Sequence, residues 1–195
     1  MVRLRNLVLF LLLLAPTFQM AWQNRTMPHF GFEHDDSIYY VVAKSVAEGT
    51  GLMIPSLPSQ PVGTKFPPGE PFYQSLAWII EPEFPKNLQV ALWLQWIWLP
   101  LTIWLMRRCA LAWGFDDWTS WAITVAMGLN TFVFWGSISV MTELQFVSCL
   151  LASMLLAKKA QENPDSEIGW AVLAGAAAAG AYLFRTIGMF LLAGF

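Results

Sequence analysis

Charged residues are scarce in this sequence. Asp, Glu, Lys and Arg make up 12% of its 195 residues, about half the share of roughly 25% that is usual in soluble domains. Hydrophobic residues make up 56%, and the mean hydropathy is +0.50. Polar groups this few cannot cover the surface of a soluble domain, so the composition predicts an integral membrane protein.

An excess of positive charge is also missing, and cysteines are few. The net charge is −2 at pH 7, whereas a protein that binds nucleic acid needs a basic face or stripe. We therefore expect no nucleic-acid partner.

Cys109 and Cys149 fall at the end of one expected span and in the middle of another. Because their depths differ, a disulfide between them is not expected, and we interpret both as packing residues.

Five apolar stretches predict membrane spans, for which roughly 17–25 residues are needed. They are residues 7–22, 88–106, 118–140 (breaking near 135–136), 141–157 and 168–184. The first could instead be a signal peptide, but no clear small-x-small cleavage site follows it, which favours an uncleaved anchor. The predicted fold class is all-α: a polytopic transmembrane helical bundle of about five spans, with short interfacial helices in a long outer loop.

The positions of Lys and Arg predict the orientation, because positive residues are retained on the cytoplasmic side of short loops. Three basic pairs fall at alternate ends of successive spans: Arg3 and Arg5, Arg107 and Arg108, Lys158 and Lys159. This pattern predicts a cytoplasmic amino terminus, with residues 23–87, the turn at 137–142 and Arg185 on the outer side. We expect a multi-pass protein of the cell membrane, in the simplest case the inner membrane of a bacterium.

The outer loop contains two short helical patterns. Residues 37–48 form the first, with Asp36 as its N-cap and Gly49 as its stop. Asp35 would then stand free ahead of this helix, where the backbone N–H groups favour its charged form. Residues 71–80 form the second pattern, which is too short to span and is expected to lie along the membrane interface.

Ionisable residues on the outer side are the candidate functional residues, because charges beside a bilayer are costly unless they are paired or hydrated. They are Asp35, Asp36, Lys65, Glu143 and Arg185. Each has a simpler interpretation when taken alone. Asp36 can be a helix cap, Glu143 can compensate a helix dipole, and Arg185 can snorkel to the interface. Their expected convergence on one side favours a shared site.

Two other groups of residues are weaker candidates. Asp116 and Asp117 also precede an apolar helix, on the side predicted to be cytoplasmic, and capping accounts for them. A paired Asp is therefore weak evidence by itself. His29 and His34 are interpreted as loop histidines, because no second spaced set of ligands accompanies them. We expect no metal or other cofactor, although the sequence leaves a divalent ion open.

Several segments resemble the GT-C superfamily of membrane glycosyltransferases. They are His34-Asp35-Asp36 with Tyr39 and Tyr40, Gly49-x-Gly51, Lys65-Phe66-Pro67-Pro68-Gly69, Met141-Thr142-Glu143-Leu144, and residues 180–188. The protein O-mannosyltransferase and aminoarabinose-transferase-like branches are the most similar in pattern. The order and spacing of these segments, from residue 30 to the carboxyl end, make the resemblance more specific than any one segment.

The resemblance implies transfer of a sugar from a polyprenyl-phosphate donor to a hydroxyl of a lipid, glycan or protein acceptor, with inversion, on the outer face. It implies that Asp35 is the general base, with Asp36 where relatives often have Glu. Lys65 and Arg185 would hold the donor phosphate. Tyr39 and Glu143 would support the site.

Members of the superfamily usually have more spans and often a soluble outer domain. We therefore expect residues 1–195 to be one membrane domain, the amino-terminal portion of a longer enzyme, which alone would lack part of the acceptor or lipid site. Two other classes stay open. A transporter would place its charges near mid-span rather than at the outer ends, and a non-catalytic membrane assembly protein would need none of the loop carboxylates.

Overall fold

The computed structural model describes residues 2–192, and its regular secondary structure there is helical apart from one bridge between Met53 and Val62. The helices are α1 (Val2–Gln23), α2 (Asp35–Ala47), α3 (Gly69–Ile80), α4 (Asn87–Trp96), α5 (Trp98–Ala112), α6 (Asp117–Gly128), α7 (Thr131–Gly136), α8 (Glu143–Glu162), α9 (Glu167–Phe184) and α10 (Met189–Leu192). Two 3-10 turns, η1 (Pro164–Ser166) and η2 (Thr186–Gly188), flank α9. The predicted all-α class is confirmed.

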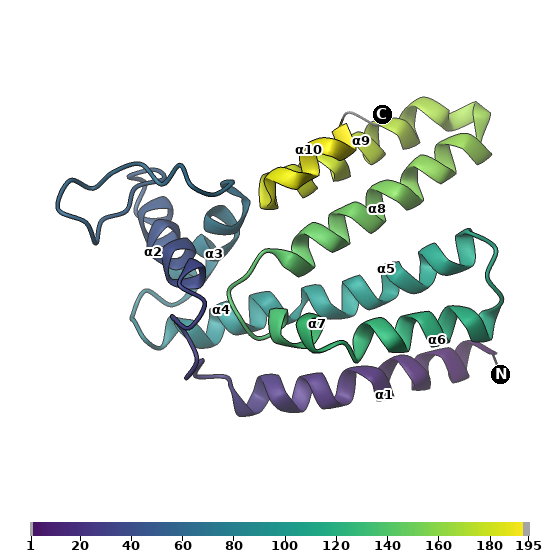
Figure 1. The fold of residues 1–195 in the computed structure, drawn as a ribbon, viewed down its shortest axis with the longest axis horizontal. Helices are drawn as coiled ribbons and strands as arrows, with labels where there is room; N and C mark the ends of the chain where they lie inside the picture. The colour runs from purple at the N-terminus through teal and green to yellow at the C-terminus, as the bar shows by residue number, and fades with distance from the viewer. Residues whose placement is uncertain (1, 193–195) are drawn as a thin grey trace.

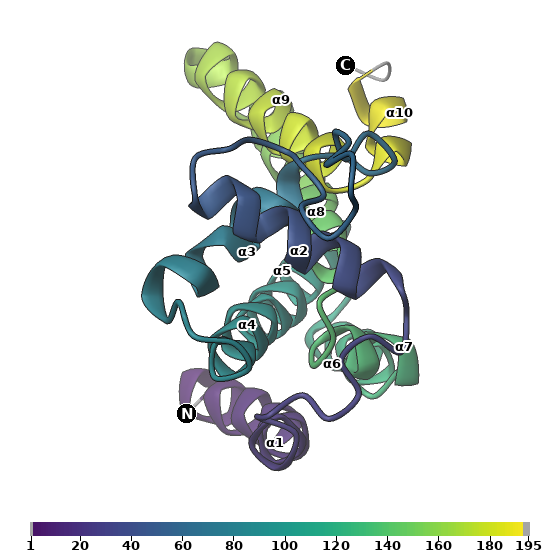
Figure 2. The same ribbon diagram turned by 90° about the vertical axis from the view of Figure 1, so that its left-hand side faces the viewer.

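The long helices form a bundle, and the polar loop covers one end of it. α5 packs against α6 and α8, and α8 packs against α9, while α1 lies along the opposite side (Figure 1). α2, α3 and the loop between them lie across the end of the bundle that faces the viewer in Figure 2. α3 contacts α2, α4 and α9, so the loop residues are brought next to the carboxyl end of α9.

Within residues 2–192, three helical segments are long and apolar enough to cross a membrane. They are Leu4–Gln23, Asn87–Ala112 and Pro164–Phe184. This finding supports a membrane protein, but it does not confirm the count of five spans. α8 is 20 residues long and carries charges at both of its ends. The third expected span is divided earlier than predicted, because α6 ends at Gly128 and Asn130 caps α7 by accepting a hydrogen bond from the Phe132 N–H.

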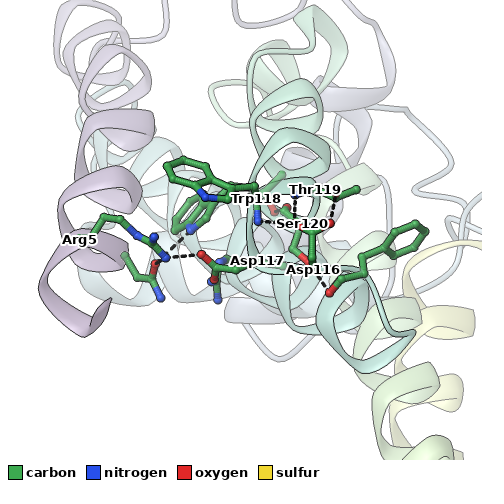
Figure 3. A network of polar contacts seen from close by, with 11 residues as sticks. Arg5, Asp116, Asp117, Trp118, Thr119 and Ser120 are labelled. Carbon is green, nitrogen blue, oxygen red and sulfur yellow. Dashed lines mark hydrogen bonds and ion pairs between the residues drawn. The ribbon is translucent and has the colours of Figure 1, made fainter. Parts of the chain in front are cut away.

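The basic ends of α1 and α5 meet the start of α6 at the end of the bundle away from the loop. Figure 3 shows Asp117 beside Arg5, and its carboxylate forms ion pairs with both Arg5 and Arg107. Asp116 caps α6 by accepting from the backbone N–H of Trp118 and Thr119 at 2.9 and 3.1 Å. Capping therefore explains Asp116, whereas Asp117 also joins three helices, which the sequence analysis missed.

The start of α2 differs from the prediction. The helix begins at Asp35, so Asp36 is inside it and not its N-cap, and Asp35 does not stand ahead of it. Asp36 is 1% exposed, and its carboxylate accepts hydrogen bonds from the backbone N–H of Gly31 and Ser37, at 2.8 and 2.5 Å. The turn before α2 folds over this carboxylate, and the helix therefore starts two residues earlier than predicted. The predicted stop is confirmed, since α2 ends at Ala47 and Gly49 has a φ of 75°.

α3 begins two residues before the predicted stretch 71–80 and is not simply an interfacial helix. Its residues Glu70 and Gln74 are fully buried, while Phe72 and Ile79 on another face are exposed. At its start, a Cβ on Gly69 would lie 2.5 Å from the carbonyl oxygen of Leu183. Glycine is therefore required where α3 meets the end of α9.

Candidate functional site

A cavity of about 620 Å³ lies between the outer-loop segment and the facing ends of α8 and α9. Five of the six predicted site residues line it: Asp35, Tyr39, Lys65, Glu143 and Arg185. They come from α2, the loop before α3, the first turn of α8 and the residue after α9. The structure thus brings together at one cavity residues up to 150 positions apart in the sequence.

Asp35 and Lys65 form the first ion pair of the cavity. Lys65 Nζ lies 3.2 Å from Asp35 Oδ1, and the ammonium group also lies 4.4 Å from the centre of the Phe66 ring. The Lys65 side chain is 68% exposed and that of Asp35 is 35% exposed. An ion pair this open to water contributes about 0–1 kcal/mol. Another anion can therefore replace Asp35 beside Lys65 at little cost.

Arg185 and Glu143 form the second ion pair. Arg185 follows α9 with an extended backbone, and its Nη1 donates to Oε1 of Glu143, the first residue of α8. Oε2 of Glu143 is buried and has no partner among the residues that the structure describes. Arginine presents several N–H donors in a planar fork. One contact with Glu143 therefore leaves other guanidinium N–H groups for an anion in the cavity.

Tyr39 forms part of the wall of the cavity beside the Asp35–Lys65 pair. Its ring packs against Phe66 with 4.7 Å between the ring centres, and the residue is only 6% exposed. Burial raises the pKa of Tyr39 to about 12, so the phenol is neutral at pH 7. It can therefore offer a neutral hydroxyl to a ligand.

Asp36 is the predicted catalytic residue that is not among the lining residues of this cavity. Its buried carboxylate is occupied by two backbone N–H groups, those of Gly31 and Ser37. This arrangement fixes the turn that leads into α2, and so it fixes the position of the neighbouring Asp35.

Glu70 is a buried ionisable residue that the sequence analysis missed. Its carboxyl oxygens accept hydrogen bonds from the side-chain amides of Gln74 in α3, Gln95 in α4 and Gln145 in α8. Glu70, Gln74, Gln95 and Gln145 are all 0% exposed. Burial raises the pKa of Glu70 to about 8, outweighing the amide hydrogen bonds, which lower it. The carboxyl group therefore holds its proton at pH 7.

The sequence contains a partial signal for this cluster. Gln74 follows Glu70 by four residues, which places both on one face of a helix. Gln95 lies within an apolar stretch, and Gln145 follows Glu143 by two residues. Only the packing of α3 against the other helices shows that these polar residues meet.

Neither loop histidine lies in a group that could hold a metal ion. Nε2 of His29 lies 2.8 Å from the carbonyl oxygen of Ile138, and His34 precedes α2 with a φ of 59°. No group of three or more His, Cys, Asp or Glu residues suited to a metal is found within residues 2–192. The absence of a cofactor stays a prediction.

Comparisons of the chain with family models, with curated proteins and with solved structures gave no match. The fold itself defines the class of the protein. The described part of the chain is all-helical with three candidate membrane spans, and a cavity with charged lining residues is formed where a loop covers one end of the helices.

Proposed function

We propose that this protein is a membrane glycosyltransferase of the GT-C type, which moves a sugar from a polyprenyl-phosphate donor to an acceptor hydroxyl. The observation that carries the proposal is the cavity in which the Asp35 carboxylate lies with two cations, Lys65 and Arg185. Transfer from a lipid phosphate needs a base for the hydroxyl proton and positive charge for the departing phosphate. The cavity contains both.

In the proposed reaction, Asp35 accepts the proton of the acceptor hydroxyl while the hydroxyl oxygen forms a bond to the anomeric carbon. The bond between this carbon and the phosphate oxygen breaks, and its electron pair stays on the phosphate. Attack from the side opposite the phosphate inverts the anomeric carbon. Lys65 and Arg185 stabilise the phosphate charge, and Asp36 holds the turn that positions Asp35.

The Asp35–Lys65 contact suggests that the donor binds first. In the free protein Asp35 Oδ1 is held by the Lys65 ammonium group, 3.2 Å away, and is therefore not free to accept from a hydroxyl. A donor phosphate at Lys65 would replace Asp35 as the partner of the ammonium group. Asp35 would then be free to accept the proton when the acceptor arrives.

The proposal is tested by donor binding. We expect the protein to bind polyprenyl phosphate more tightly than polyprenol, which has the same chain without the phosphate. Replacing Lys65 or Arg185 with glutamine should weaken polyprenyl-phosphate binding by about 10- to 100-fold each, because each variant loses a charge-assisted contact of about 1.5–3 kcal/mol. Intrinsic tryptophan fluorescence of the detergent-solubilised protein can measure both ligands. Equal affinity for the phosphate and the alcohol would contradict the proposal.

Replacing Arg185 and Glu143 separates a phosphate contact from a structural ion pair. If Arg185 binds phosphate, Arg185→Lys should weaken polyprenyl-phosphate binding while the melting temperature stays near that of wild type, because lysine keeps the charge but loses the planar fork. If the pair is only structural, Arg185→Ala and Glu143→Ala should lower stability similarly, and the double variant should recover part of the loss. Unchanged donor affinity in Arg185→Ala would remove this residue from the site.

We also propose five spans, completed by α6–α7 and α8, with the amino terminus in the cytoplasm and the cavity on the outer side. Ser59 and Asn163 are exposed and lie in the outer loop and after α8, respectively. In a background without Cys109 and Cys149, Ser59→Cys should react with a membrane-impermeant thiol reagent added to intact cells. Asn163→Cys should react only after the cells are opened. The reverse pattern would show the opposite orientation.

A further inference from the structure

Arg107 and Arg108 are adjacent at the end of α5, yet their surroundings differ. Arg107 pairs with Asp117 and lies over the Trp121 ring, 4.7 Å from its centre. Arg108 is exposed, and no hydrogen bond or ion pair involving it is found within the described residues 2–192. The charge of Arg107 is therefore balanced within the protein, whereas that of Arg108 is available to a partner.

Two clefts meet at Arg108. One, of about 290 Å³, lies between the carboxyl ends of α5 and α8, where Lys158 and Lys159 join Arg108. Its single carboxylate, Glu162, pairs with Lys158 at 3.2 Å, which leaves the charges of Arg108 and Lys159 in excess. The other, of about 370 Å³, lies between α1, α5 and α6 and includes Trp104. The excess of cations in the first cleft gives it a positive potential.

Apolar side chains lie directly beside these charges. Leu111 and Leu155 line the first cleft, while Leu7 and Phe10 line the second. Trp104, one turn before Arg108 on α5, is 52% exposed. This surface therefore has cations at the end of a candidate span and apolar groups along the span. An anionic phospholipid is complementary to it, because a negative headgroup is followed by apolar acyl chains.

We propose that Arg108, with Lys158 and Lys159, binds the phosphate headgroup of an anionic phospholipid whose acyl chains lie along α5. An arginine fork matches two phosphate oxygens at once, and each nearby lysine adds attraction to an anionic headgroup. Trp113, whose ring lies 5.6 Å from Lys158 Nζ, places an indole at the same level, where aromatic residues favour the membrane interface. This site is at the opposite end of the bundle from the cavity and does not depend on the glycosyltransferase proposal.

The test compares lipid retention by the purified full chain. Detergent-solubilised protein is titrated with phosphatidylglycerol or with phosphatidylcholine, and bound lipid is counted by native mass spectrometry. We expect preferential retention of phosphatidylglycerol. Arg108→Gln should lower its affinity about fivefold, because one basic residue near an anionic headgroup has about this effect. Arg108→Gln combined with Lys159→Gln should lower it further, while phosphatidylcholine retention stays the same.

Arg25→Gln is the matched control, since Arg25 lies at the opposite end of the α1 span and is already hydrogen-bonded to the carbonyl oxygen of Trp22. It should leave phosphatidylglycerol retention nearly unchanged. A melting curve in phosphatidylcholine checks that the Arg108 variant is folded. Equal retention of the two lipids, or equal losses in the Arg25 and Arg108 variants, would overturn the proposal. Displacement of phosphatidylglycerol by an equal concentration of inorganic phosphate would show a free-phosphate site and also overturn it.

Discussion

Asp35→Asn should lower the rate of sugar transfer by about 10²–10⁴, the usual effect of losing a general base. Asparagine keeps the size of the side chain and can accept a hydrogen bond from Lys65, but it cannot take the proton of the acceptor. Binding of polyprenyl phosphate should persist, because Lys65 and Arg185 are retained. The measurement is transfer of labelled sugar from polyprenyl-phosphate donors, offered one sugar at a time to the reconstituted protein, beside the donor-binding assay.

Glu83→Gln is the control for this experiment. Glu83 also belongs to the outer-loop segment and forms an exposed ion pair, with its Oε2 2.7 Å from Lys86 Nζ, but it does not line the cavity. Its replacement should leave the rate unchanged. Asp117 is a poor control, because it joins Arg5 and Arg107. Equal transfer rates for wild type and Asp35→Asn would remove Asp35 from the role of base.

Glu70 should make the stability of the protein fall as the pH rises. The pKa of this carboxyl is about 8 in the folded protein, compared with the ordinary value of 4.5. Between these values the folded state holds a proton that the unfolded state has released. The free energy of unfolding therefore decreases by about 1.4 kcal/mol per pH unit in this window. The stabilising effect is complete below about pH 4.5 and is lost as the pH rises through about 8.

Glu70→Gln should remove this dependence and make the protein more stable than wild type at alkaline pH. The amide stays neutral, and Gln145 can turn its amide so that its unpartnered Oε1 accepts the new N–H. Glu70→Ala should instead destabilise the protein by about 3 kcal/mol or more, since three buried amides lose an acceptor and a cavity forms. Denaturant unfolding of the detergent-solubilised variants at a series of pH values measures both effects.

Glu48→Gln is the matched control for charge, because Glu48 is exposed and pairs with Lys44 on the last turn of α2. Its pH profile should follow that of wild type. An equally steep profile in Glu70→Gln would show that another group causes the pH dependence. Unchanged sugar transfer in Glu70→Gln would assign Glu70 to the framework. Loss of proton-coupled solute uptake in Glu70→Gln, in a protein without transferase activity, would favour the transporter class.

The sequence alone determined the class of the fold and the positions of most helices. Apolar runs far longer than a soluble core requires predict helices, because backbone groups in lipid must be satisfied within the helix itself. The local signals for helix ends were also reliable where they depend on one residue, as at Gly49 and Asp116. The sequence also singled out the four charged residues that line the cavity, Asp35, Lys65, Glu143 and Arg185, because charges are rare in so apolar a chain.

Only the tertiary structure decided which charges pair and which polar residues are buried. Lys65 meets Asp35, and Arg185 meets Glu143, through the packing of the loop against α8 and α9. The start of α2 depends on the turn that closes over Asp36, so the cap pattern misplaced it. Glu70 resembles a loop residue in the sequence. It is buried because α3 packs between other helices, and packing between distant segments leaves no pattern in a local stretch of sequence.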